Sequence, residues 1–194
     1  MNMARTYTLK KRAAQQAETR RRIIEAAVDL HSTVGPAATT LSMIAERASV
    51  QRHTLYAHFP DEWSIFLACS GHVYANDPLP DAAAWRDIAE GRERLATGLR
   101  AVYDWYERHA SLMACVTRDA EHHKLTREIG QLRFAPSAMA WRDVLGAALN
   151  AKQRAMLYLA LSFHTWRSLV RESGLKQDAA VRTMVDAIEA AAED

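Results

Sequence analysis

Residues 39–59 read TTLSMIAERASVQRHTLYAHF and predict two short helices joined by a sharp turn. In the first helix, apolar residues such as Ile44 and Ala48 recur at helical spacing and form one inward face. The turn follows Ala48, and the second helix is expected over residues 51–57, with Leu55 directed back toward the first. A short helix that packs steeply on another and carries a polar outer face is suited to the major groove of DNA.

The outer face of the second predicted helix is polar. Apart from the ring of Tyr56, it offers only hydrogen-bonding and cationic groups. Arginine pairs bidentately with guanine and glutamine with adenine, each worth about 1–3 kcal/mol of discrimination. We therefore expect base contacts from Arg52 above all, and also from Gln51, His53 and Thr54. An arginine at this position can equally bind the phosphate backbone, so its role stays open between bases and phosphates.

The composition predicts an all-α protein. The 194 residues are 49% hydrophobic and 25% charged, with only 7 glycines and 5 prolines, and long segments have helical periodicity. Cys69 and Cys115 lie far apart without metal-ligand spacing, so we expect no disulfide framework and a cytoplasmic location. The basic N-terminus lacks the apolar core of a signal peptide, and no apolar run is long enough to cross a membrane.

Positive charge is concentrated at the N-terminus. Residues 1–22 hold seven Lys or Arg residues against Glu18 alone, directly before the predicted helix pair. Such a segment can be a solvated, disordered tail, but beside a DNA-binding helix its cations can bind phosphates and release counterions. We therefore expect residues 1–17 to form a flexible arm that contacts DNA through Lys10, Lys11 and Arg12.

The rest of the chain divides into further helices. A helix over residues 18–33 completes a DNA-binding domain of residues 18–60, residues 61–76 form a linking helix, and residues 77–194 form a larger C-terminal domain. In that domain helices are expected over residues 83–109, 112–119, 126–149 with a kink at Pro136, 152–172 and 177–192. The helix of residues 152–172 is apolar on nearly every side between residues 156 and 163, which indicates a partner subunit.

These features resemble the TetR family of bacterial transcriptional regulators. The resemblance covers about 50 residues and is carried by Thr19-Arg20, Ile23, Ala26-Ala27, Leu30, Gly35, Thr39-Thr40, Ile44-Ala45, Val50, Thr54-Leu55-Tyr56 and His58-Phe59. It implies an all-α homodimer with an N-terminal three-helix helix-turn-helix DNA-binding domain and a C-terminal ligand-binding and dimerisation domain. It also implies a repressor that leaves a palindromic double-stranded operator when a small molecule binds.

Two positions depart from the family pattern. The turn carries Ser49 where the family has glycine, and a left-handed serine costs on the order of 1 kcal/mol. Glu62 occupies the place of a lysine that commonly contacts phosphate, and its charge would repel the DNA backbone. We therefore assign phosphate contacts to Thr40, Tyr56 and His58, together with the basic arm, and we expect Thr39 to belong to the same DNA-binding site.

A ligand site is expected in the larger domain, which is rich in aromatic residues. Aromatic walls with a few polar groups suit a hydrophobic or aromatic ligand, although each aromatic residue can equally belong to the core. The expected lining residues are Tyr103, Tyr106, Trp141, Phe163 and Trp166.

No cofactor and no metal are expected. The run of residues 119–123, DAEHH, could place metal ligands on one helical face, but a charged helix end explains it more simply. The sequence also lacks the phosphate-loop and zinc motifs of common enzymes, so we expect no enzymatic activity. The alternative to a ligand-released repressor is a DNA-bound dimeric adaptor without a small-molecule ligand.

Overall fold

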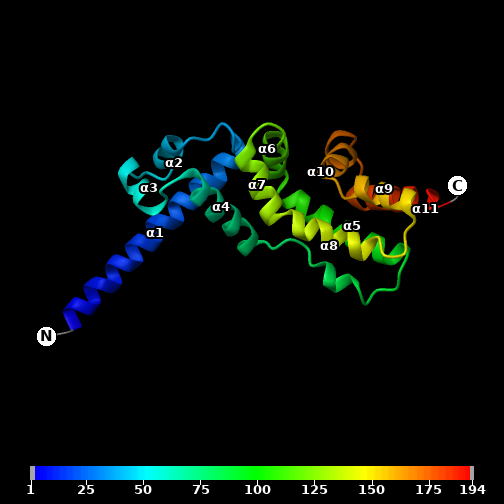
Figure 1. Ribbon diagram of the computed structural model, residues 1–194, viewed down its shortest axis with the longest axis horizontal. Coiled ribbons are helices and arrows are strands. Elements are labelled where there is room, and N and C mark those ends of the chain that lie inside the picture. Colours follow the sequence, from blue (N-terminus) through cyan, green and yellow to red (C-terminus); the bar gives the residue numbers. More distant parts are fainter. Residues whose placement is uncertain (1–2, 193–194) are drawn as a thin grey trace. The chain divides into compact units, whose positions relative to one another are not determined.

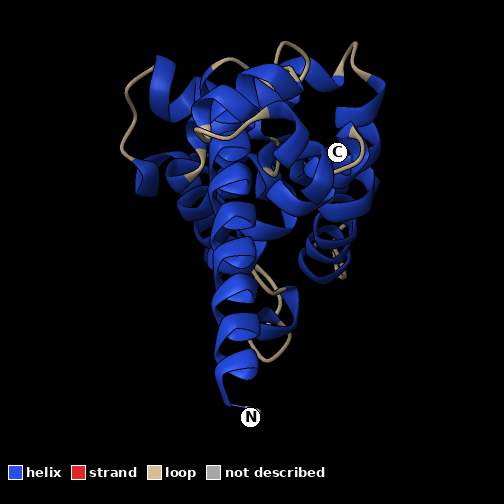
Figure 2. Cartoon of the chain, turned by 90° about the vertical axis from the view of Figure 1, so that its left-hand side faces the viewer, coloured by secondary structure: helices blue, strands red, loops and turns tan. Residues whose placement is uncertain are grey.

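The computed structural model describes residues 3–192, which contain helices and turns and no strand (Figure 1, Figure 2). The predicted all-α class is confirmed. The chain forms two compact units. The first, here called the N-terminal unit, contains Met1–Asp77 and Ala114–Ile129, and the second, the C-terminal unit, contains Pro78–Met113 and Gly130–Asp194. The N-terminal unit is therefore built from two stretches of sequence.

The N-terminal unit is a small helical domain around one hydrophobic core. Its α1 packs against α2 and α4, and α2 packs against α3. The core includes Ile23, Ile44, Leu55, Phe59 and Ile65. Its helices are α1 (Met3–Thr33), α2 (Leu41–Arg47), α3 (Arg52–His58) and α4 (Glu62–Asn76), followed later by the end of α6 (Ala110–Ala120) and the start of α7 (Lys124–Arg133).

The first helix begins at Met3, well before the predicted start at residue 18. The segment that was expected to be a flexible arm is thus helical from Met3 onward, while residues 1–2 lie outside the described part. Residues 3–33 contain no glycine or proline and are rich in alanine, lysine, arginine and glutamine, which favour helix. The helix ends at Thr33, just before Gly35, whose φ is 104°.

Side-chain caps define the starts of two helices. Thr40 caps α2, because its hydroxyl accepts a hydrogen bond of 3.2 Å from the backbone N–H of Met43. Asp61 caps α4 by accepting from the backbone N–H of Ser64 at 2.8 Å, and the Ser64 hydroxyl completes a capping box.

The C-terminal unit is a bundle of short helices. Its core lies where α11 packs against α5 and α9, with Val181, Val185 and Ile188 buried. The elements are η1 (Ala82–Trp85), α5 (Arg92–Arg108), α8 (Ala135–Leu145), α9 (Ala151–Ala160), α10 (Phe163–Trp166), the π-helix η2 (Arg167–Glu172) and α11 (Gln177–Ala190).

Three helices that were predicted to be continuous are broken. The helix expected over residues 83–109 is interrupted before α5, where Gly91 has a φ of 106° and the Arg94 guanidinium donates to the Ile88 carbonyl at 2.8 Å. The helix expected over residues 126–149 ends at Arg133, and α8 starts beside Pro136, which lacks an N–H for a preceding turn. The third break falls just before Ser162, whose hydroxyl caps α10.

Candidate nucleic-acid interface

The short helix α3 has a polar outer face, and its inner face packs in the core. Leu55 is 1% exposed and lies in the core, whereas Gln51, Arg52 and His53 are exposed. Thr54, the remaining residue expected to contact bases, is half-buried. The structure therefore brings three of the four expected base-contacting side chains to the surface of one helix, where a groove of DNA could receive them.

The turn before α3 requires a left-handed residue. Ser49 has a φ of 52°, the one positive φ of a non-glycine residue in the described chain. Its N–H donates to the Glu46 carbonyl at 3.0 Å, and the next N–H, of Val50, donates to the Ala45 carbonyl at 2.9 Å. These bonds close the end of α2 and fix the angle at which α3 departs.

The two threonines before α2 have different surroundings. Thr39 is buried, and its hydroxyl donates to the Gly35 carbonyl at 2.7 Å. Thr40 is exposed at the N-terminus of α2, and its hydroxyl oxygen accepts from Met43, which leaves the hydroxyl hydrogen free to donate outward. Only Thr40 is thus placed for a direct phosphate contact, whereas Thr39 secures the preceding loop.

Tyr56 and His58 lie at the far end of α3. Tyr56 is 45% exposed, and His58, the last residue of the helix, is half-buried. The next helix starts with acidic groups, because Asp61 caps α4 and Glu62 occupies its first turn. Carboxylates at a helix N-terminus satisfy the positive end of the helix dipole and leave little attraction for a phosphate there.

Cations of α1 add positive charge to this unit. The side chains of Lys10, Lys11, Arg12 and Arg22 are exposed, and none of them forms an ion pair with another described residue. Arg21 is different, since its guanidinium lies 2.7 Å from a Glu18 carboxylate oxygen and 2.6 Å from a Glu25 oxygen. The structure therefore leaves the three expected arm cations available to an external anion.

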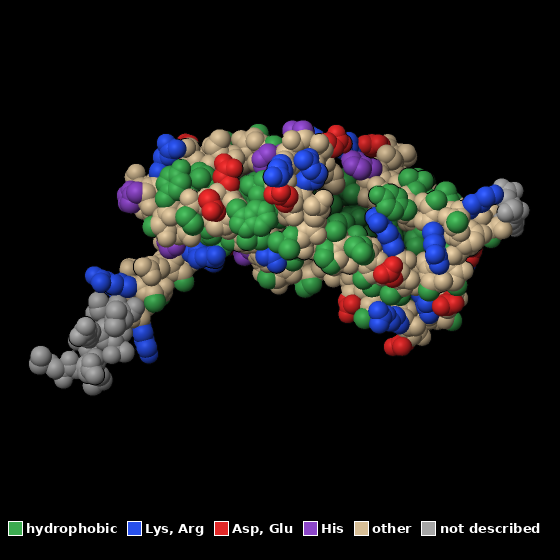
Figure 3. All heavy atoms as spheres, in the orientation of Figure 1, with side chains coloured by type: hydrophobic (Ala, Val, Ile, Leu, Met, Phe, Trp, Pro, Cys, Tyr) green, Lys and Arg blue, Asp and Glu red, His purple; other side chains and the backbone are tan. Residues whose placement is uncertain are grey.

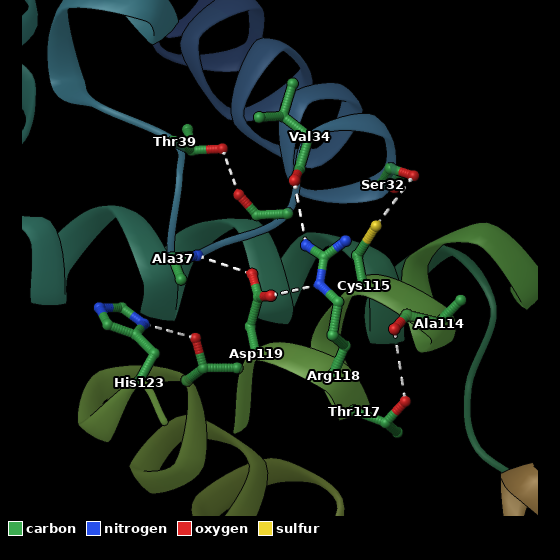
Figure 4. A network of polar contacts seen from close by, with 12 residues as sticks. Ser32, Val34, Ala37, Thr39, Ala114, Cys115, Thr117, Arg118, Asp119 and His123 are labelled. Atoms are coloured by element: carbon green, nitrogen blue, oxygen red, sulfur yellow. Dashed lines mark hydrogen bonds and ion pairs between the residues drawn. The ribbon is translucent and has the colours of Figure 1, made fainter. Parts of the chain in front are cut away.

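A pair of residues from α6 holds the loop between α1 and α2 (Figure 4). The buried Asp119 carboxylate accepts from the Ala37 N–H at 2.8 Å, and it also accepts from the Arg118 Nε at 2.7 Å. Arg118 in turn donates from Nη2 to the Val34 carbonyl at 3.1 Å. We call this arrangement the α6 clamp.

The α6 clamp approaches Gly35 very closely. A Cβ atom at Gly35 would lie 2.2 Å from Arg118 Nη2 and 2.6 Å from Asp119 Oδ2. Burial raises the pKa of Asp119, but the hydrogen bonds from Arg118 and the Ala37 N–H lower it below its ordinary value. The sequence indicates only a charged helix end at Asp119, because no spacing relates this residue to a loop some 80 residues earlier.

A buried histidine lies in the last turn of α1, against α4. His31 is 4% exposed, its Nδ1 lies 3.5 Å from the Cys69 sulfur, and its ring centre lies 4.7 Å from that of Phe66. Its Nε2 has no hydrogen-bond partner among the described residues. Burial lowers the pKa of His31 to about 4, against an opposing effect of the Asp119 charge, so the ring is neutral at pH 7.

The five residues expected to line a ligand pocket lie in the interior of the C-terminal unit, with their polar atoms bonded. The hydroxyls of Tyr103 and Tyr106 donate to the carbonyls of Ala160 and Leu161, at 2.9 and 2.8 Å. Trp141 donates its indole N–H to the Pro80 carbonyl at 2.7 Å. Phe163 and Trp166 pack with Tyr106 as an aromatic cluster.

An open cavity of about 400 Å³ lies elsewhere in the C-terminal unit, between the end of α8 and α9. Its lining includes Arg142, Arg154 and Tyr158, and the Arg142 guanidinium stacks 4.1 Å from the centre of the Tyr158 ring.

Across residues 3–192, no three potential ligand side chains converge in a group that could hold a metal ion. In the same range, no helix combines the length and apolar character needed to cross a membrane.

Comparison with known proteins agrees with this architecture. Residues 23–69 match the model of bacterial regulatory proteins of the tetR family. The transcriptional repressor NicS of Pseudomonas putida is 25% identical over 114 residues, which are 59% of this chain and 54% of NicS. The chain thus spans about half the length of that relative.

Solved structures share the fold. A tetR-family transcriptional regulator from Streptomyces coelicolor has a TM-score of 0.61 at 19% identity, covering 90% of this chain and 80% of that one. FadR from Bacillus subtilis, solved in complex with stearoyl-CoA, has a TM-score of 0.60 at 15% identity, covering 87% and 96%. Residues 23–69, from α1 into α4, thus match the family model of bacterial regulatory proteins of the tetR family, and the chain shares its fold with these solved regulators.

Proposed function

We propose that this protein is a transcriptional regulator that binds double-stranded DNA and contacts bases with α3. The observation that carries the proposal is Arg52, which is exposed and forms no ion pair with another described side chain, on a short helix anchored in the core by Leu55. Guanidinium groups bind guanine bidentately, and the neighbouring Gln51 can bind adenine. The name of NicS, a transcriptional repressor, supports repression as the outcome of binding.

The residues around α3 would fix its position on the DNA. Thr40, Tyr56 and His58 are assigned to phosphates, and Lys10, Lys11 and Arg12 are assigned to the flanking backbone. His53 and Thr54 assist in base contacts, while Thr39 acts from the interior by holding the loop to Gly35.

Selection of bound fragments from random DNA tests this proposal. We expect one enriched half-site, repeated as a palindrome. Arg52→Ala should then weaken binding to the selected site about 5- to 150-fold, corresponding to about 1–3 kcal/mol, and weaken binding to random DNA much less. Arg182→Ala, which removes an exposed arginine of α11, is the matched control. Equal losses on both DNAs would assign Arg52 to phosphate, and no enriched sequence would refute base recognition.

We further propose that a small hydrophobic or aromatic molecule releases the protein from DNA. Helix α6 starts in the C-terminal unit and ends at the α6 clamp, so a ligand that displaces α6 would disturb the loop before α2. FadR, which shares the fold, was solved with stearoyl-CoA. Tyr103, Tyr106, Trp141, Phe163 and Trp166 remain the candidate lining, and their packing means that a ligand must displace side chains to enter.

A thermal-shift screen with long-chain acyl-CoA, fatty acids and aromatic acids tests the ligand. We expect one class to raise Tm and also to release the protein from its selected DNA fragment. A broad library without any stabilising compound would favour the alternative, a DNA-bound dimeric adaptor without a small-molecule ligand.

We also propose that the protein acts as a homodimer through α9. Tyr158 and Leu159 are 59% and 48% exposed on that helix, and a second copy would cover them. Two copies of α3 would then contact half-sites about 34 Å apart. Leu159→Lys should shift sedimentation from dimer to monomer, whereas Leu132→Lys, at a residue that is 53% exposed on α7, should not.

A further inference from the structure

Helix α1 continues far beyond the core of its unit. The first fully buried side chain is Ile23, and between Lys10 and Arg22 every side chain is exposed except the half-buried Thr19. Residues 3–19 of α1, here called the α1 extension, span about 25 Å at 1.5 Å per residue. Figure 1 shows this part of α1 standing clear of α2, α3 and α4.

The extension leaves the domain next to the proposed DNA-contacting helix. The Arg20 guanidinium lies 4.9 Å from the centre of the Phe59 ring, and Phe59 directly follows the last residue of α3. Because α1 passes the end of α3 at this level, the residues before Arg20 project past α3. A duplex bound on α3 would therefore continue alongside the extension.

The charge of the extension indicates a polyanionic partner. Lys10, Lys11 and Arg12 have exposed side chains and form no ion pair within the described chain, whereas the nearest acid, Glu18, is bonded to Arg21. Figure 3 shows Lys and Arg side chains projecting from the described part of this segment. The sequence of residues 10–18, KKRAAQQAE, has no apolar stripe, so a membrane surface or a partner helix is a poor match.

The α1 extension can stay helical because it continues a helix that is packed in the core. A helix of this length is marginal in isolation, but here the packed residues of α1 provide the nucleus from which it propagates. We propose that the α1 extension binds the DNA backbone beside the site of α3 as an unbroken helix, and that its cations reach phosphates only while the helix is continuous. This inference rests on the proposed function, which assigns these cations to the flanking backbone, and adds that the contact requires an unbroken helix.

The test separates the shape of the extension from its charge. Ala14→Pro breaks the extension and keeps every cation, because proline removes a backbone N–H and clashes with the preceding turn. A triple variant, Lys10→Gln, Lys11→Gln and Arg12→Gln, removes the cations and keeps a good helix former at each position. Ala14→Ser is the matched control for a substitution that leaves the helix intact. Residue 14 is exposed, so thermal unfolding of the core should be unchanged in all three variants.

Binding of the full-length variants to the selected fragment is measured by fluorescence anisotropy over a series of KCl concentrations. We expect both the triple variant and Ala14→Pro to bind about tenfold more weakly at low salt. In both, the slope of log K against log salt should flatten by about 1–2 per chain, since each phosphate contact contributes about 0.9. Ala14→Ser should match the wild type.

Two results would overturn the inference while leaving the proposed function intact. If Ala14→Pro binds like the wild type and the triple variant is weakened, the segment acts as a flexible charged tail. If the triple variant also binds like the wild type, the extension does not touch DNA. Failure of the wild type to bind any selected DNA would instead overturn the proposed function and this inference together.

Discussion

In the C-terminal unit two arginines of α5 pair with acids of α11, whereas in the N-terminal unit most cations of α1 and α3 form no ion pair within the described chain. Arg92 bonds to Asp186 and Glu189, and Arg100 bonds to Asp178. Arg52 and Lys11 have no such partner among the described side chains. Exposed ion pairs contribute only about 0–1 kcal/mol each, but they also remove cations from competition for an external anion. The difference supports the proposal that the N-terminal unit binds DNA.

The two units also differ in the polar groups that they bury. The N-terminal unit buries ionisable groups, Asp119 and His31, and one of them has an unbonded ring nitrogen. The C-terminal unit buries tyrosine and tryptophan, and their polar atoms are bonded to main-chain or side-chain acceptors. The N-terminal unit should therefore respond more strongly to pH and to small changes in geometry.

The largest expected effect comes from Gly35→Ala. The new methyl group must displace the Arg118–Asp119 pair, and alanine is strained at a φ of 104°. Backbone strain of about 1–2 kcal/mol and the loss of charged hydrogen bonds of about 1.5–3 kcal/mol predict a loss of roughly 3–4 kcal/mol in the free energy of unfolding. Urea titration measures it. Gly130→Ala, where a Cβ meets nothing within 4 Å, should be neutral or stabilising, and an equally harmless Gly35→Ala would contradict the α6 clamp.

His31 predicts a pH dependence of stability. The folded pKa of His31, about 4, lies below the ordinary histidine value of 6.5, so below pH 6.5 the unfolded chain binds more protons than the folded chain. Stability should be constant above pH 6.5 and should fall by up to about 3 kcal/mol as the pH decreases to 4. Urea titrations at several pH values measure it, and His31→Leu should remove this part of the slope. An unchanged slope in that variant would assign the acid sensitivity to other groups.

Tyr106→Phe tests the C-terminal unit. Removing the hydroxyl leaves the buried Leu161 carbonyl without this donor and should cost about 1–2 kcal/mol of unfolding free energy. Tyr158→Phe, at a side chain that is 59% exposed, should change stability by less than about 0.5 kcal/mol. If the two substitutions have similar effects, the hydrogen bond from the buried Tyr106 hydroxyl does not contribute to the stability of the C-terminal unit.

The smallest expected effect is an increase in stability. Ser49→Gly should stabilise the N-terminal unit by about 1 kcal/mol, because glycine adopts the left-handed conformation of this turn without strain. Ser49→Asn should give a smaller gain and Ser49→Val a loss, since asparagine tolerates this conformation and a β-branched residue does not. Thermal unfolding of the three variants orders them, and a destabilised Ser49→Gly would show that the serine side chain makes a necessary contact.

The helix-turn-helix elements could be predicted from the sequence because local signals specify them. Spacing of Ile44 and Leu55, the Thr40 cap and the Asp61 cap all act within a few residues, and α2 and α3 lie where the pattern placed them. Other features depend on contacts that no local sequence pattern reveals. The break before α5 is held by the Arg94 guanidinium, and the α1–α2 loop is held by Asp119 across 82 positions of sequence.

The divided origin of the N-terminal unit has a practical consequence for engineering. A chimeric regulator that joined residues 1–77 of this chain to the body of another protein would omit residues 114–129. The Ala37 N–H would then lose its carboxylate acceptor, and the Val34 carbonyl would lose its guanidinium donor. A graft of the DNA-binding specificity should therefore carry the end of α6 and the start of α7 with it, or supply an Arg-Asp pair at the equivalent place in the new body.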